Sequence, residues 1–234
     1  MLLATTTIAV ASVSGAAGWE LNSHIKGAST AADDQWLIKL VDLAGQFPSG
    51  FHLTSADTTD VTEQSLRRPE SLTRGATVIP AYCANPAEQA VGASPPAGAI
   101  VASLTGITSD RLLEITALVS SQPIPLRVSP PHCDAVVFYR AGLIQGFTGP
   151  ISLPPTPEGV AVKSSQAVRA RYTITDGNGP SIDTVRYVYR VLLDDLHSVT
   201  VTFIGRINPG RIGDIDTTPA DELFSHALAT LRSP

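Results

Sequence analysis

The stretch that decides the fold is RARYTITDGNGPSIDTVRYVYRVLLDDLHSVTVTF, residues 169–203. Apolar and polar residues alternate in three runs within it, at 169–174, 185–191 and 197–203. Such alternation is typical of β-strands, because successive side chains of a strand point to opposite faces of the sheet. The DGNGP sequence at 176–180 has the composition of a turn, and Asp194 and Asp195 mark a second, tighter connection. The stretch therefore predicts three consecutive antiparallel strands.

A helix is predicted after these strands, at the C-terminal end of the chain. Thr218 precedes Pro219, and Asp221 follows Thr218 by three residues, which is the pattern of a helix N-terminus. The apolar residues that come next share one helical face: Leu223, Phe224, Ala227, Leu228 and Leu231. A stripe of this kind packs against the rest of the domain. Sheet and stripe together predict an α+β fold, with an antiparallel β-sheet and helices packed on one face.

Other elements are predicted earlier in the chain. Apolar residues at helical spacing predict a helix at 33–44, and ANPAEQAV at 84–91 predicts a short helix. Strands are predicted at 51–54 (FHLT), 99–107 (AIVASLTGI) and 111–119 (RLLEITALV). The last of these also fits a helical period, and we predict a strand there. The polar segment 54–75 receives no assignment.

Length and composition are those of a single folded domain. The chain has 234 residues, of which 43% are hydrophobic and 16% charged. Disordered chains combine low hydrophobicity with high net charge, so they are excluded. The net charge of −5 argues against a nucleic-acid partner, because binding to phosphates depends on many lysines and arginines. We predict one domain at 33–234.

The first residues have the pattern of a secretory signal. Residues 2–19 carry no charge, and the apolar LLATTTIAVASV is followed by the small residues SGAAG. We predict a signal peptide at 1–18, cleaved near 16–18, and a linker at 19–32. A signal peptide needs basic residues before its apolar part, so we expect translation to start upstream; a core strand or helix is the alternative interpretation. The segment is too short and too rich in Thr and Ser for a stable transmembrane anchor.

Cys83 and Cys133 are the only cysteines. Both follow loop-type residues, and an even number of cysteines in an exported protein favours a disulfide. The bridge would close a loop of about 50 residues, worth roughly 4 kcal/mol in the chain-entropy account. Two free buried thiols are one alternative, and metal ligation with His132 is another, although a closed zinc site needs more ligands. We predict a structural disulfide and no metal site.

A family resemblance rests on the order of four short motifs. These are PSGF at 48–51, a first cysteine in a proline-flanked turn, PPHC at 130–133, and Tyr187-x-Tyr189 followed by HSVTV at 197–201. In this order they resemble a mycobacterial family of secreted proteins and lipoproteins of unknown function. That family is in turn similar to the extracytoplasmic sensor domains of mycobacterial serine/threonine kinases. The resemblance implies an envelope location, an α+β fold and a ligand or partner role, and it supplies no catalytic residues.

One feature departs from many members of that family. VSGA at 13–16 looks like a lipobox in which Ala16 replaces the cysteine that would carry the lipid. Lipid attachment at this position is therefore chemically impossible. We expect a protein that is soluble in the envelope or released from it.

The sequence lacks the stronger signatures of catalysis. It contains no GxSxG elbow, no Gly-rich phosphate loop, no HExxH and no CxxC, and its five histidines are scattered. Asp195, His197 and Ser198 lie close together and suggest a hydrolytic triad. Neighbouring residues of a strand point to opposite faces, however, so these three side chains cannot form one. We predict no catalytic residue and no cofactor, with a hydrolase of envelope lipid or glycan as the alternative function.

The predicted sheet has a polar side that is rich in arginine. If the apolar sides of its strands coincide, four residues share the polar side: Arg169, Arg171, Arg186 and Arg190. A solvated face of a one-sided sheet explains such alternation. Arginine side chains also bind carboxylates and phosphates well, so the four form a candidate anion-binding face.

These observations together predict a non-enzymatic, exported envelope domain with a sensor-like binding role. Its partner would be an envelope lipid, a glycan or a protein. A pocket between the C-terminal helix and the sheet is the expected binding site, because ligand sites are concave and largely apolar.

Overall fold

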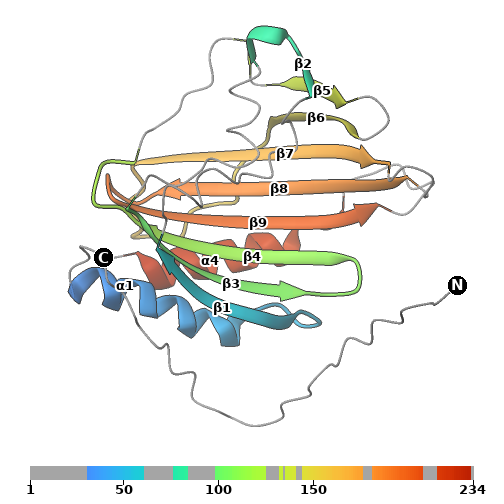
Figure 1. The fold of residues 1–234 in the computed structure, drawn as a ribbon. Helices are drawn as coiled ribbons and strands as arrows, with labels where there is room; N and C mark the ends of the chain where they lie inside the picture. The colour runs from blue at the N-terminus through green and yellow to red at the C-terminus, as the bar shows by residue number, and fades with distance from the viewer. Residues whose placement is uncertain are drawn as a thin grey trace, which may run out of the picture.

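The computed structural model describes residues 31–60, 76–83, 98–124, 132–133, 135–140, 144–175, 181–207 and 215–232. Its main feature is one nine-stranded antiparallel sheet with the strand order β1-β3-β4-β9-β8-β7-β6-β5-β2 (Figure 1). The strands are β1 (His52–Asp60), β2 (Thr77–Ile79), β3 (Ile100–Ile107), β4 (Arg111–Val119), β5 (Val136–Arg140), β6 (Ile144–Pro150), β7 (Ser164–Ile174), β8 (Ile182–Leu192) and β9 (His197–Ile207). Strands adjacent in the sheet are mostly adjacent in sequence, as is usual for antiparallel sheets.

The three predicted consecutive strands form the middle of this sheet. Strands β7, β8 and β9 have 11 residues each and pair in sequence order. The strand predictions at 99–107 and 111–119 are confirmed by β3 and β4, and β1 begins within the predicted 51–54. β2, β5, β6 and the second half of β1 had no prediction.

Two α-helices lie together against one face of the sheet, over its β3, β4 and β9 region (Figure 1). They are α1 (Ala31–Asp42), which continues into the 3₁₀ helix η1 (Leu43–Gln46), and α4 (Thr218–Leu231). The predicted stripe of α4 is confirmed, since all five of its residues are fully buried. These five residues pack against α1 and against the facing side chains of β3, β4, β8 and β9, and together they form the main core.

The start of α4 is fixed by a polar contact with the sheet. Its N-cap residue is Thr217, one residue before the predicted cap, and the Thr217 hydroxyl donates to Asp221 over 3.1 Å. The phenol of Tyr189 on β8 donates to the other oxygen of Asp221 over 2.7 Å. Burial and the hydrogen-bonded carboxylate of Asp221 raise the pKa of Tyr189 above its ordinary value. These contacts thus belong to a helix that begins one residue before the start predicted from the sequence.

A second core covers the opposite face of the sheet, at the end away from the helices. It includes Val78 of β2, Phe138 of β5 and Tyr172 of β7, which lie around the disulfide. The Cys83–Cys133 bond is present, so the predicted pairing is confirmed. Cys83 ends the 3₁₀ helix η2 (Ala81–Cys83), which follows β2 after Pro80, and Cys133 lies just before β5. The bond therefore ties two strands at the edge of the sheet to each other.

The predicted α+β fold with helices packed on one face is wrong as a description of this architecture. Within the described residues there are only two α-helices, of 12 and 14 residues, and the nine-stranded sheet dominates. The physical reason is the second core, in which side chains of β2, β5, β6 and β7 pack around the disulfide and, in the part of the chain that the structure describes, not against an α-helix. The short helix predicted at 84–91 lies outside the described residues.

Candidate functional site

The structure places the four predicted arginines on both faces of the sheet. In the register of β7 and β8, Arg169 lies opposite Tyr187, a residue of the main core. Residues directly opposite each other in antiparallel strands share a face. Arg169 and Arg171 of β7 therefore lie on the main-core face. Arg186 and Arg190 of β8 lie on the other face. The expectation of a single arginine face is wrong, and anion binding by these residues stays a prediction.

Arg186 takes part in a largely buried electrostatic cluster on the second-core face. Its partners are Glu114 on β4 and Tyr172 on β7. Burial lowers the pKa of Arg186 and raises the pKa values of Glu114 and Tyr172, while the attraction between the charges opposes each shift. Arg186 Nε, like the hydroxyl of Thr148, has no hydrogen-bond partner among the described residues. In a buried pair of opposite charges each charge stabilises the other. Removal of one of the two side chains would therefore leave the other charge buried without its partner.

The expected pocket between the C-terminal helix and the sheet is instead part of the main core. Leu223, Phe224 and Leu228 of α4 have no exposed surface, and the ring of Phe224 contacts Tyr189 edge-on at 5.6 Å. These side chains pack within the main core and present no surface to a ligand from outside.

An exposed apolar surface lies on the main-core face where the helices do not reach. Four large hydrophobic side chains there are 38–54% exposed: Ile79 on β2, Val137 and Tyr139 on β5, and Phe147 on β6. Ile79 lies opposite Val137, which lies opposite Phe147, so the three form one row across neighbouring strands. We call these four side chains, with Arg169 and Arg171 beside them on β7, the platform.

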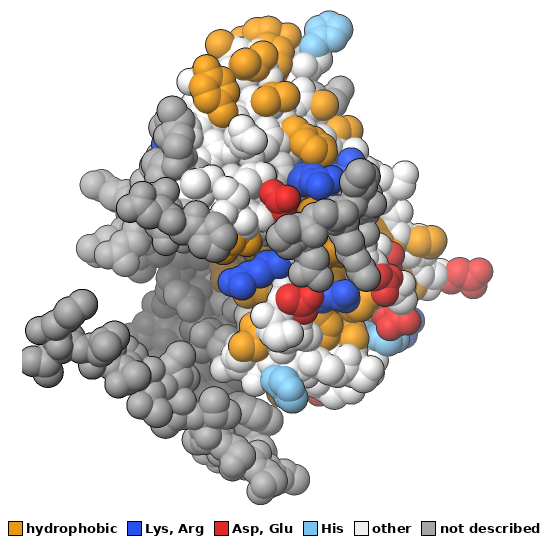
Figure 2. All heavy atoms as spheres, turned by 90° about the vertical axis from the view of Figure 1, so that its right-hand side faces the viewer, with side chains coloured by type: hydrophobic (Ala, Val, Ile, Leu, Met, Phe, Trp, Pro, Cys, Tyr) orange, Lys and Arg blue, Asp and Glu red, His pale blue; other side chains and the backbone are white. Residues whose placement is uncertain are grey.

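The arginines form the inner border of the platform. Arg171 lies directly opposite Phe147, and the guanidinium of Arg169 lies over the Phe147 ring, 5.6 Å from its centre. A cation over an aromatic face is attracted by the π-electrons of the ring. In Figure 2, hydrophobic side chains gather at the top of the molecule, which is the β2 and β5 end of the sheet. Single exposed apolar residues are common, whereas a contiguous apolar group on adjacent strands is a candidate interaction surface.

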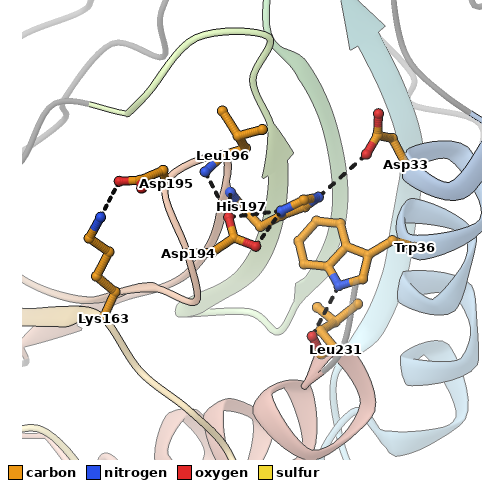
Figure 3. A network of polar contacts seen from close by, with 8 residues as sticks. All are labelled: Asp33, Trp36, Lys163, Asp194, Asp195, Leu196, His197 and Leu231. Carbon is orange, nitrogen blue, oxygen red and sulfur yellow. Dashed lines mark hydrogen bonds and ion pairs between the residues drawn. The ribbon is translucent and has the colours of Figure 1, made fainter.

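A second polar cluster surrounds His197 at the start of β9 (Figure 3). Its Nδ1 lies 2.8–2.9 Å from both carboxylate oxygens of Asp194. Because a carboxylate only accepts hydrogen bonds, Nδ1 carries the proton. Nε2 lies 3.5 Å from an oxygen of Asp33 on α1, and the ring meets Trp36 edge-on at 4.8 Å. His197 thus connects the first helix to the turn between β8 and β9.

This cluster does not have the arrangement of a hydrolase. Ser198 lies opposite Leu118 and Leu192 on the other face of the sheet from His197, as the strand geometry predicts. Asp195, the acid considered from the sequence, pairs with Lys163, and Asp194 is the residue that contacts His197. In the described part of the chain, the polar contacts of the His197 ring are with aspartates, whereas a hydrolase needs a nucleophile beside its base. Nor does any group of three His, Cys, Asp or Glu in this part form a metal site.

Asp194 makes the turn sensitive to acid. Burial raises its pKa, but hydrogen bonds from the backbone N–H groups of Leu196 and His197 and from the His197 ring lower it more, so the pKa lies below its ordinary value. A depressed carboxylate pKa stabilises the fold above the pKa of the unfolded chain, and this contribution is lost as the pH falls through the folded value.

We therefore expect Asp194→Asn to lower the free energy of unfolding at pH 7 by about 1 kcal/mol, since a side chain that is 43% exposed is screened by water. The difference from the wild type should shrink below about pH 4, where the carboxylate of the unfolded chain becomes protonated. Urea unfolding between pH 7 and pH 3 measures both effects. Asp195→Asn is the matched control and should change stability little, because its ion pair with Lys163 is exposed. A constant difference across the pH range would contradict this account.

Comparison with known proteins shows which family this chain belongs to. The family described as a domain of unknown function (DUF5642) matches residues 37–232. The chain belongs to this DUF5642 family. The match begins one residue after Trp36 and includes every strand of the sheet and α4, so the platform and the disulfide lie within the DUF5642 domain. No curated protein matches the chain significantly.

One solved structure shares the fold of this DUF5642 protein. It is the X-ray structure of an uncharacterised Mycobacterium smegmatis protein, the Rv0999 ortholog, with a TM-score of 0.62 and 22% sequence identity. The alignment covers 84% of this chain and 97% of that chain. At this identity the likeness concerns the fold alone. Within the described residues, no helix is long and apolar enough to span a membrane.

Sequence reasoning missed the apolar part of the platform. A signal was nevertheless present in VVFY at 136–139, a run of four apolar residues. On a strand such a run places two apolar side chains on each face of the sheet. If only one face is covered, the pair on the other face is exposed to water. In the structure Val136 and Phe138 are buried in the second core, and Val137 and Tyr139 are exposed.

Proposed function

We propose that this DUF5642 protein is an exported domain of the cell envelope that binds a ligand or partner through the platform and catalyses no reaction. The single observation that carries the proposal is the platform itself, four exposed hydrophobic side chains on neighbouring strands with two arginines at their border. Isolated proteins rarely keep such a group in contact with water unless a partner covers it.

The proposal includes an extracytoplasmic location. Residues 1–18 would act as the export signal, 19–32 as a linker and 33–234 as the folded domain. The Cys83–Cys133 disulfide supports this, since such bonds persist in oxidising compartments and are rare in the cytosol. The motifs resemble a mycobacterial family of secreted proteins and lipoproteins, and the similarity of that family to the sensor domains of mycobacterial kinases is the basis for proposing a sensor-like role. The alternative of a hydrolase gains no support from His197, whose ring contacts serve to hold α1 and a turn.

Site-specific photo-crosslinking in the envelope of a mycobacterial host tests the proposal. The crosslinker replaces Val137 on the platform or, as the matched control, Ile38 on the outer side of α1; these side chains are 50% and 53% exposed. We expect a crosslinked species of defined mass from position 137 and none from position 38. The intact mass of the same protein should lack residues 1–18. Equal crosslinking at both positions, or none at 137, would contradict a binding role for the platform.

A further inference from the structure

We infer that the partner of the platform is the surface of an anionic lipid bilayer. This inference rests on the proposed function and names the chemistry of the partner. The platform would lie flat on the membrane, with its apolar side chains among the lipid headgroups and its arginines on the phosphates. The binding would be peripheral and reversible.

The shape of the platform suits a broad surface. Its residues belong to successive strands of one sheet face, with side chains in rows at the same level across β2, β5 and β6. In Figure 2 hydrophobic side chains gather on the rounded top of the molecule, at the β2 and β5 end of the sheet. A small ligand is held by a concave site that surrounds most of it, whereas a bilayer is contacted by a protruding one.

The residue types also suit the boundary between lipid and water. Ile79, Val137 and Phe147 present only apolar groups, and Tyr139 presents a ring with a polar tip. Tyrosine is enriched at membrane–water interfaces for this reason. Each side chain is between 38% and 54% exposed, so part of it is held by the sheet and part is available for contact. The hydrophobic contribution to membrane binding is therefore shared among four partly buried side chains.

The charge on this face is complementary to anionic lipid, although the whole chain carries −5. Arg169 and Arg171 border the apolar row, and Arg169 is held at the level of the Phe147 ring. Asp183 of β8 lies on the same face, and its carboxylate already accepts a hydrogen bond from Thr173 over 2.6 Å. Arginine binds phosphate oxygens in a bidentate manner, and each basic residue near an anionic surface adds roughly 1 kcal/mol.

Co-sedimentation of the oxidised protein with vesicles tests the inference. One set of vesicles contains phosphatidylcholine alone, and the other contains phosphatidylcholine with phosphatidylglycerol. We expect binding to the anionic vesicles only, and weaker binding as the salt concentration rises. Arg171→Ala should weaken it about fivefold, which corresponds to one basic residue. Val137→Glu should abolish it while leaving the fold intact, because the side chain is half exposed.

Arg190→Ala is the matched control, since Arg190 lies on the opposite face of the same sheet and should leave binding unchanged. Failure of the anionic vesicles to bind, or equal losses for Arg171→Ala and Arg190→Ala, would overturn the inference. If the platform then crosslinks to a protein in the envelope, the proposed function stands and only the membrane inference fails. If position 137 gives no crosslink either, both fail.

Discussion

Replacing Trp36 with alanine is expected to lower the free energy of unfolding by about 4 kcal/mol, within the range for large aromatic residues in a core. The Trp36 side chain is 1% exposed and lies between α1, α4 and β9. Its indole N–H donates to the carbonyl of Leu231 over 3.0 Å (Figure 3). The last carbonyls of a helix have no partner within the helix, so this bond satisfies one that would otherwise be buried alone. The substitution would remove both the packing and the hydrogen bond.

Two control variants separate these contributions in a urea titration. Trp36→Phe keeps an aromatic ring and removes the donor, and should cost roughly 2 kcal/mol because a buried carbonyl loses its partner. Ile38→Ala lies on the same helix at a side chain that is 53% exposed, and should cost less than about 0.5 kcal/mol. A loss below about 1 kcal/mol for Trp36→Ala would show that α1 is not held by this residue. The position of α1 would then depend on its other contacts with the main core.

Much of this fold follows from local patterns in the sequence. The alternating runs of β7, β8 and β9 and the stripe of α4 each report which side of an element is apolar, and those elements form as predicted. The pattern within one strand says nothing about which face its apolar side joins. Ala170 and Tyr172 on β7 belong to the second core, whereas Val185 and Tyr187 on β8 belong to the main core. The sheet carries buried apolar side chains on both faces, and the alternation pattern of a single strand cannot reveal that.

The arginines show the consequence for the candidate site. Ile174 pairs with Ile182, and this register places even-numbered residues of β7 opposite even-numbered residues of β8. Arg169 and Arg186 therefore face opposite ways, whereas a shift of one residue would have brought them together. Register depends on how both strands pack against the two cores, which is information from distant parts of the chain. The platform was missed for the same reason, because its row joins β2, β5 and β6 through pairing that no local pattern encodes.

Loss of the Cys83–Cys133 disulfide is expected to have a comparably large effect. A bridge between residues 50 apart in sequence removes chain entropy from the unfolded state, which corresponds to about 4 kcal/mol. Urea unfolding with and without a reductant should show this difference for the wild type. The double variant Cys83→Ala, Cys133→Ala should resemble the reduced wild type and should not respond to the reductant. Equal midpoints for oxidised and reduced wild type would contradict this prediction.

The position of the disulfide predicts which part of the sheet loses its structure when the bond is reduced. The disulfide joins the residues that follow β2 to those that precede β5, and both half-cystines are buried in the second core. β2 has only three residues and pairs with β5 alone, at the edge of the sheet. Such a short edge strand has few hydrogen bonds of its own, so we expect it to separate from β5 first when the bond is broken. Because Ile79 and Val137 lie opposite each other across this pair, reduction should weaken vesicle binding under conditions in which the main core remains folded. Trp36 fluorescence follows the main core when the other tryptophan, Trp19, is replaced by phenylalanine. A reduced protein that binds anionic vesicles as well as the oxidised one would show that the platform does not depend on the bond.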